Sequence, residues 1–369
     1  MKKLTILKTL ILGVLTIMCF YACKKDISSV KPNLTTNNDL SSDLFTANFG
    51  TGWVNLVADT AGFNASLLDT NLVNAWGIAS PPGGPIWISA NHKGVSTVYN
   101  RTTGATLRPA VTVPSAMTGQ TGAPTGLVFN STADFGGNKF IFAGEDGIIA
   151  AWKAGNVASK VADRSSFNTV YKGLTMANIG PNNFLYATDF RNGKIDVFDK
   201  NFNFVTPSKP FVDPGIPAGY APFNIQKIGD KLFVTYAKQK LPDKMDDDRG
   251  LGNGYVDIFM PDGTFVKRFF SKGDLNSPWG IALAPKGFAG DQQTILIGNF
   301  GDGKINVFDS GGKHFGELQS GGHALVIDGL WAIDFLNGNN PGMGSSTDWL
   351  YFTAGPVEES HGVFGYLHK

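Results

Sequence analysis

Two stretches of this chain place an oxygen-bearing side chain at the same point of a matching pattern. "FLYATDFRNGKIDVFD" spans residues 184–199 and "TILIGNFGDGKINVFD" spans residues 294–309. Each reads as an apolar strand, a polar turn with glycine and a second strand, with Asp189 or Asn299 where the first strand ends. Carboxylate and amide oxygens suit Ca²⁺, which takes about six to eight oxygen ligands. The alternative is that both side chains cap their turns by bonding to backbone N–H groups.

Further oxygen ligands for such a site come from other parts of the chain. Asn74 and Asp328 precede apolar stretches, and Glu145 follows one in a shorter hairpin. If the pattern repeats along the chain, these three side chains reach the same face as Asp189 and Asn299. We therefore treat the five residues as one candidate Ca²⁺ site, although no complete metal-binding motif is present.

A polar insertion, "KQKLPDKMDDDRGLGNG", interrupts the pattern at residues 238–254. Inserted loops often carry function, and the three aspartates at residues 246–248 are a second candidate for binding a cation. The alternative is a mobile, soluble loop held by Lys244 and Arg249.

Histidine and carboxylate side chains near the C-terminus are candidates for proton transfer. "VEESHG" contains Glu358 and His361, which are predicted to form a catalytic pair because histidine titrates near neutral pH. His323 and His92 are further candidates, His323 for ligand binding, and the alternative for the "VEESHG" segment is a solvated turn. No Gly-x-Ser-x-Gly elbow, His-Glu-x-x-His zinc motif or phosphate-binding loop occurs in the sequence.

Three tryptophans are candidates for ligand binding. Trp76, Trp279 and Trp331 each begin an apolar stretch, and indole rings stack well on a sugar or another flat molecule. The alternative is that the three indoles fill the space between neighbouring structural units.

The elements that must position these residues form a sixfold repeat. Each unit opens with an apolar stretch, and the six stretches begin near Trp76, Thr125, Leu174, Phe223, Trp279 and Trp331. A hairpin follows each opening stretch, and a weaker fourth strand follows most hairpins. Four short strands at a regular period predict an all-β fold, a six-bladed β-propeller over residues 53–369. The last unit lacks a fourth strand, which residues 53–59 are predicted to supply.

"NFLYATDFRNGKIDVFD" and "SPWGIALAPKGFAGDQQTILIGNFGDGKINVFD" resemble NHL-type repeats and the SMP-30-like family of six-bladed, calcium-dependent lactonases and phosphotriesterases. In that family Glu, Asn and Asp side chains at one end of the propeller hold the metal, which implies the roles given above to Asp189 and Asn299. Residues 53–367 also resemble a family of exported, uncharacterised propeller proteins.

The composition limits the classes of partner. Charged residues make up only 17% of the chain and the formal net charge is +1, so no basic surface for nucleic acid is expected. The two cysteines are Cys19 and Cys23. A domain that begins after them has neither a disulfide nor a cysteine nucleophile.

The N-terminus predicts export. Residues 1–22 combine a basic start with an apolar run, as a secretory signal peptide does, and Ala22 precedes Cys23 as in a bacterial lipoprotein. Phe20 stands where leucine is usual in such sites. We expect a lipidated Cys23, a flexible tether over residues 23–52 and a location in the cell envelope. "CKKD" resembles the start of Bacteroidota outer-membrane lipoproteins. An uncleaved anchor helix is the alternative.

Two functions remain open from the sequence. The first is an exported, membrane-anchored propeller, expected to be a monomer, that binds a glycan, a protein or a small ligand on its loop face. The second is a divalent-metal-dependent hydrolase of the lactonase or esterase type, in which the metal polarises a carbonyl group.

The lipid anchor predicts the behaviour of one variant. Cys23→Ala removes the thiol that would be acylated, so the protein should leave the membrane fraction or accumulate as precursor. Fractionation and intact mass check this. A variant that fractionates with the membrane like the wild type, with the same mass, would show that Cys23 is not lipidated.

Overall fold

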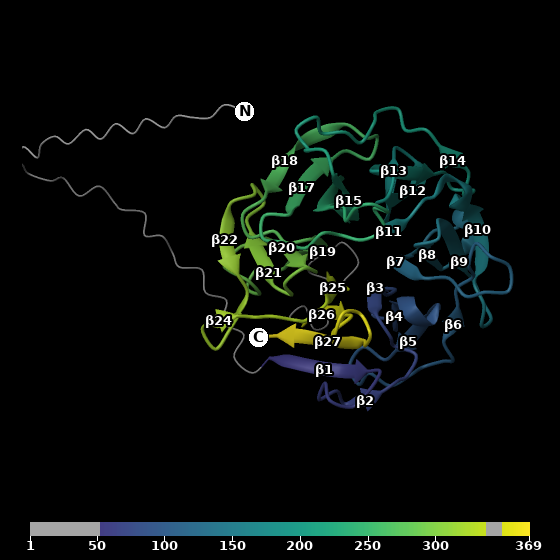
Figure 1. Ribbon diagram of the computed structural model, residues 1–369. Helices are drawn as coiled ribbons and strands as arrows, with labels where there is room; N and C mark the ends of the chain where they lie inside the picture. The colour runs from purple at the N-terminus through teal and green to yellow at the C-terminus, as the bar shows by residue number, and fades with distance from the viewer. Residues whose placement is uncertain (1–51, 337–348) are drawn as a thin grey trace, which may run out of the picture. The chain divides into compact units, whose positions relative to one another are not determined.

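The computed structural model describes residues 52–336 and 349–369. These residues form six β-sheets arranged as blades around a common axis (Figure 1). This confirms the predicted all-β, six-bladed propeller. The predicted signal peptide, Cys23 and the tether lie outside the described residues, apart from Gly52.

The strands of each blade follow one another in the sequence, from the axis to the rim. Blade one comprises β3 (Ala75–Ala79), β4 (Ile86–Ala90), β5 (Val95–Tyr99) and β6 (Val111–Thr112). Blade two comprises β7 (Pro124–Phe129), β8 (Phe140–Gly144), β9 (Ile148–Trp152) and β10 (Ser159–Asp163). Blade three comprises β11 (Tyr171–Ile179), β12 (Asn182–Asp189), β13 (Lys194–Phe198) and β14 (Phe204–Val205).

The remaining blades follow the same order. Blade four comprises β15 (Tyr220–Ile228), β16 (Lys231–Lys238), β17 (Gly254–Phe259) and β18 (Phe265–Ser271). Blade five comprises β19 (Pro278–Ala284), β20 (Thr294–Asn299), β21 (Ile305–Phe308) and β22 (His314–Glu317). Blade six comprises β25 (Leu330–Asp334), β26 (Trp349–Ala354), β27 (Val363–His368) and β1 (Trp53–Ala58), with β2 (Leu67–Leu68) beside β1.

Short elements complete the described chain. They are the hairpin of β23 (Gln319–Ser320) and β24 (His323–Ala324), and the 3₁₀ turns η1 (Asn91–Lys93), η2 (Phe135–Gly137) and η3 (Ser165–Phe167). Within the two described ranges, no helix has the length and apolar character to cross a membrane.

Strand β1 closes the ring as the sequence predicts. It pairs antiparallel with β27, with Trp53 opposite Leu367 and Ala58 opposite Val363. The side chains of Leu56 and Val57 are 3% and 1% exposed, so the pairing also buries apolar surface. Because β1 lies near the start of the chain and β27 at its end, one sheet joins the two ends (Figure 1). The pairing protects an edge that blade six would otherwise expose.

Each innermost strand has the same irregularity near its start. The register with the next strand shifts there, as in a β-bulge, in all six blades. The residues at the bulge, here called the six axial residues, are Trp76, Thr125, Lys172, Phe223, Trp279 and Trp331. All six are 4% exposed or less. The predicted start of the third unit is therefore corrected, since Lys172 and not Leu174 is equivalent to Trp76.

Glycine after the axial residue lets neighbouring innermost strands approach closely. A Cβ atom on Gly77 would lie 2.2 Å from the carbonyl oxygen of Thr125, and one on Gly126 would lie 2.5 Å from the backbone nitrogen of Leu174. Such distances are shorter than any tolerable contact, so these positions require glycine.

The closing pair predicts how truncations behave. Deleting residues 53–59 should destabilise the whole ring by about 3 kcal/mol or more, because burying each of Leu56 and Val57 contributes about 1.5–3 kcal/mol and blade six gains an exposed edge. Deleting residues 24–50 is the control. Thermal unfolding of both truncations checks this, and equal melting temperatures would reject β1 as the closing strand.

Candidate functional site

The axis of the propeller has two ends. We call the end where the innermost strands begin the entry end, and the end where they finish the exit end. The turns between the second and third strands, including η1, also lie at the entry end, as do the residues predicted to bind Ca²⁺. The two ends differ in chemistry.

A buried lysine dominates the entry end. Lys172, only 2% exposed, donates from Nζ to Glu145 Oε1 at 2.5 Å and lies 3.5 Å from Asp246 Oδ1. Its ammonium also lies 4.9 Å from the ring of Trp76, which adds a cation–π contact. Burial disfavours the charged form, but the carboxylates of Glu145 and Asp246 more than offset this, so the pKa of Lys172 is raised.

Amides link the carboxylates on either side of this lysine. Asn91 Nδ2 donates to Glu145 Oε2 at 2.9 Å, and Asn74 Nδ2 donates to Glu359 Oε2 at 2.8 Å. Asn74 Oδ1 in turn accepts a hydrogen bond from the indole of Trp331 at 2.9 Å. Side chains from four other blades, namely one, two, four and six, thus surround or adjoin the ammonium of blade three.

The turn between β26 and β27 has an unusual backbone that presents Glu359. Val357, Glu358 and Glu359 have φ of 55°, 50° and 64°, three successive non-glycine residues in the left-handed region. Such conformations are costly and recur at functional sites. Burial, together with the nearby Glu145 carboxylate, raises the pKa of Glu359, while Lys172 opposes the shift. The strained turn therefore holds a carboxylate in a partly dehydrated position.

The insertion that separates β16 from β17 reaches over the entry end. Arg249 lies 3.3 Å from Glu358 and 3.8 Å from Glu359, and its guanidinium lies 4.4 Å from the ring of Phe300. The three aspartates of the insertion do not converge. Asp246 faces Lys172, whereas Asp248 pairs with Lys238 at 2.6 Å.

The five candidate calcium ligands do not assemble. Asn74 and Glu145 lie in the network around Lys172, but the other three bond within their own surroundings. Asp189 accepts from Val170 N and Asn192 Nδ2, as a turn cap does.

Asn299 donates to Asp274 O, and Asp328 accepts from Val357 N. Within the described ranges, no three His, Cys, Asp or Glu side chains are grouped so as to hold one ion. Since the ammonium of Lys172 sits among the oxygens that do converge, the donor set does not fit a bound Ca²⁺.

The predicted pair of His361 and Glu358 is not formed. His361 Nδ1 lies 2.9 Å from Asp59 Oδ2, and the same carboxylate accepts from the backbone of Gly362. Glu358 points instead to Arg249. The difference arises because β1 brings Asp59, the residue directly after it, beside the β26–β27 turn.

The other two histidine candidates lie apart from this pair. His323 lies on the β23–β24 hairpin at the rim (Figure 1), and His92 is exposed on η1.

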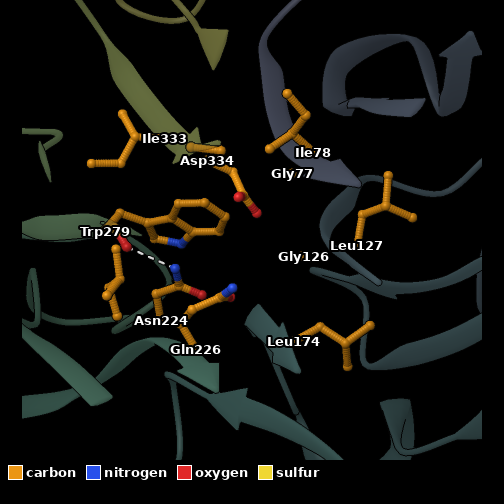
Figure 2. A pocket seen from close by; sticks show the side chains of 12 residues that line it. Gly77, Ile78, Gly126, Leu127, Leu174, Asn224, Gln226, Trp279, Ile333 and Asp334 are labelled. Carbon is orange, nitrogen blue, oxygen red and sulfur yellow. Dashed lines mark hydrogen bonds between the residues drawn. The ribbon is translucent and has the colours of Figure 1, made fainter. Parts of the chain in front are cut away.

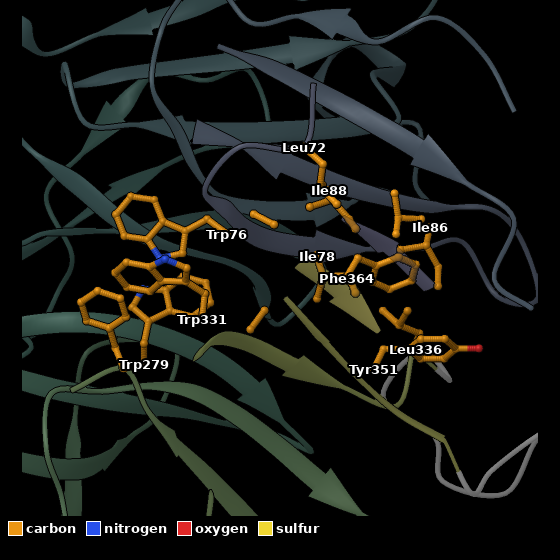
Figure 3. Close-up of a cluster of buried hydrophobic side chains, with 14 of the residues drawn as sticks. Leu72, Trp76, Ile78, Ile86, Ile88, Trp279, Trp331, Leu336, Tyr351 and Phe364 are labelled. Carbon is orange, nitrogen blue, oxygen red and sulfur yellow. The ribbon is translucent and has the colours of Figure 1, made fainter. Parts of the chain in front are cut away.

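The three candidate tryptophans pack against one another (Figure 3). The ring centroids of Trp76 and Trp331 are 3.9 Å apart, and Phe300 stacks on Trp331 at 3.7 Å. The centroid of Trp279 lies 5.8 Å from that of Trp331. These rings fill the axis just below the entry end. Among the described residues, no tryptophan ring face is therefore open at that end for the predicted stacking on a ligand.

The described residues leave a hollow at the exit end. A narrow pocket of about 30 Å³ in the axis is lined by residues from all six innermost strands, among them Trp279, Gln226 and Asp334. It adjoins a wider cavity of about 330 Å³. Ile78, Leu127, Gln226 and Asp334 line both, so the two form one channel.

Polar groups face this channel from the innermost strands (Figure 2). The carboxyl of Asp334 and the indole of Trp279 point towards its centre. The indole N–H of Trp279 is buried and has no hydrogen-bond acceptor among residues 52–336 and 349–369. Asn224 Nδ2 donates to the Trp279 carbonyl at 2.7 Å.

Sequence reasoning missed Asp334 and Gln226. The signal available was a polar side chain in the second half of an innermost strand, Asp334 in "WAIDF" and Gln226 in "FNIQK".

Comparison with known proteins identifies relatives. No family model matches the chain. Two proteins of Acanthamoeba polyphaga mimivirus are similar along most of their length. "Uncharacterized protein R648" is 33% identical over 340 residues, 86% of this chain and 81% of that protein. "Uncharacterized protein L690" is 33% identical over 341 residues, 86% of this chain and 85% of that protein.

Solved structures share the fold. A streptogramin B lyase matches with a TM-score of 0.52 at 12% identity, covering 82% of this chain and 95% of that one. The calcium-binding protein regucalcin from Agrobacterium tumefaciens matches with a TM-score of 0.51 at 14% identity, covering 81% and 91%. At such identities the likeness is one of fold, and it agrees with the predicted propeller architecture.

The channel carboxyl predicts a pH dependence. Burial raises the pKa of Asp334 from 3.8 to about 6, against hydrogen bonds from the backbone of Leu336 and Phe335. Because the folded pKa exceeds the unfolded one, ionisation is costlier in the folded protein, and this group removes stability as the pH rises from about 4 to about 6.

Asp334→Asn cannot ionise, so the variant should gain stability relative to wild type across that window and hold the gain above it. Urea unfolding at several pH values checks this. Asp230→Asn is the control, since Lys231 lowers the pKa of that exposed carboxyl. Parallel pH profiles of wild type and Asp334→Asn would contradict the assignment.

Proposed function

The chain belongs to the protein family of the two mimivirus proteins, and we propose that it is a binding propeller that takes a small, hydroxyl-rich ligand into the exit-end channel. The observation that carries this proposal is the cavity of about 330 Å³, which is within the size range of small-molecule sites. The opposite end of the axis is filled by indoles and by the network around Lys172, so the exit end offers the access.

The lining favours a ligand of the sugar class. Asp334 supplies a carboxylate and Gln226 a side chain that both donates and accepts, which suits neighbouring hydroxyl groups. The unpaired indole N–H of Trp279 can donate to a ligand oxygen or to a bridging water in the narrow pocket. Ile78 and Leu127 provide the apolar wall that the less polar face of a sugar ring contacts. A single small ring with several hydroxyl groups matches all of these features.

The proposal also includes the cellular location of the protein. The N-terminal pattern of residues 1–23 supports export and lipidation, which would hold the propeller at the cell envelope, where free sugars and glycans occur. A binding role needs no catalytic group, and the pairing of His361 with Asp59 ties β1 to the β26–β27 turn.

A metal-dependent hydrolase is the second candidate. Its support is the shared fold with calcium-binding regucalcin, and one fold hosts many functions. A hydrolase of this type would require an ion that the donor set described above does not fit, so binding is the better supported proposal.

The sugar proposal is tested by titrating the full chain with D-glucose, D-galactose, N-acetyl-D-glucosamine and maltose. Isothermal titration calorimetry should detect binding of at least one of them. Asp334→Asn and Gln226→Leu should each weaken that binding about tenfold or more, since a hydrogen bond to a charged group contributes about 1.5–3 kcal/mol and each 1.4 kcal/mol is about tenfold in affinity.

Glu358→Gln is the matched control, because that carboxylate is exposed at the opposite end. It should bind as the wild type does. The proposal is wrong if none of the four sugars binds, or if binding responds to Glu358→Gln and not to the channel variants.

A further inference from the structure

One of the six axial residues carries a charge. Trp76, Thr125, Phe223, Trp279 and Trp331 are uncharged, and blade three alone among these positions has a lysine, Lys172. A buried ammonium is costly unless it is paired and hydrogen-bonded. The groups around the Lys172 nitrogen must therefore offset the cost of burying its charge.

Oxygen atoms from several blades converge on this ammonium. Glu145 of the β8–β9 turn bonds to it directly, and Asp246 of the insertion lies within ion-pair distance. Glu359 of the β26–β27 turn also attracts it, and is held in place by the amide of Asn74. Asn91 fixes the other oxygen of Glu145. The ammonium thus lies among carboxylate oxygens that the amides of Asn74 and Asn91 hold in place, and carboxylate oxygens are ligands of hard cations.

The charges explain why a cation is needed at this point. The carboxylates of Glu145, Asp246 and Glu359 face the ammonium, and Lys172 also attracts the buried carboxyl of Asp247. Arg249, 3.8 Å from Glu359, is the second cation nearby. Glu145 and Glu359 are only 23% and 29% exposed. Without a central cation they would repel one another across a partly dehydrated space. A covalently attached ammonium supplies that charge whatever the ion content of the solution, and it joins the turns of blades two and six to the insertion of blade four.

We propose that the ammonium of Lys172 is a built-in cation that takes the place of a divalent metal ion at the entry end. The wild-type propeller is then charge-balanced there without calcium. Removing the ammonium leaves carboxylate oxygens that accept Ca²⁺ in its place. This inference is independent of the ligand proposed for the exit end.

The test compares thermal unfolding of the full chain in chelator and in millimolar CaCl₂. Wild type should melt at the same temperature in both. Lys172→Met should melt several degrees lower than wild type in chelator and regain at least half of the loss with calcium. Calorimetric titration with CaCl₂ should show about one ion bound to the variant, at least tenfold more tightly than to wild type.

Lys194→Met is the matched control. Lys194 also pairs with two carboxylates, Asp189 and Asp196, but it is 41% exposed and not an axial residue. Its replacement should create no calcium response. Lys172→Met/Glu145→Gln removes one carboxylate as well, so it should be more stable in chelator than Lys172→Met and should lose most of the calcium response.

Two outcomes would overturn the proposal. One is a calcium-dependent rise in the melting temperature of the wild type that Glu359→Gln abolishes, because the site would then already hold a metal. The other is a Lys172→Met protein that gains no calcium binding. If Lys172→Met does not fold in chelator, its folding on addition of calcium supports the proposal. Failure to fold with calcium, while the double variant folds, contradicts it.

Discussion

Filling the axis of the ring is the constraint on which the rest of the structure depends. Six sheets meet there, and each contributes one residue from a bulge near the start of its innermost strand. Glycine at positions such as Gly77 lets adjacent strands come close enough for these side chains to touch. Four of these six residues are aromatic, the three tryptophans and Phe223. The other two, Thr125 and Lys172, are buried as well, so their polar atoms need hydrogen-bond partners within the protein.

This filling divides the axis into two chemically different ends. On the entry side of the indoles, Lys172 bonds to Glu145, attracts Glu359 and contacts the insertion through Asp246. On the exit side of the indoles, the innermost strands line a channel that has Asp334 and Gln226 in its wall. Charge pairing therefore occupies one end, and the hollow at the other end is where we propose that a ligand binds.

The sequence predicts the architecture well because periodicity and turn residues are local signals. The six units, their strand order and the closing role of residues 53–59 all follow from repeated short patterns. The predicted start of the third unit is wrong because this unit has a lysine where the others have an uncharged residue. A search for apolar residues does not select that position. Contacts between residues far apart in the sequence are harder to predict. His361 pairs with Asp59, 302 positions away, and only closure of the ring brings them together.

The central claim is that the entry end is closed by an internal cation while ligands enter from the exit end. A crystal structure of the wild type grown with millimolar calcium and a saturating monosaccharide tests it most directly. The account predicts the Lys172 ammonium against Glu145 with no calcium there, and the sugar between Trp279, Gln226 and Asp334. A calcium ion bound by Asn74, Glu145 and Glu359, or a sugar at the entry end, would contradict it.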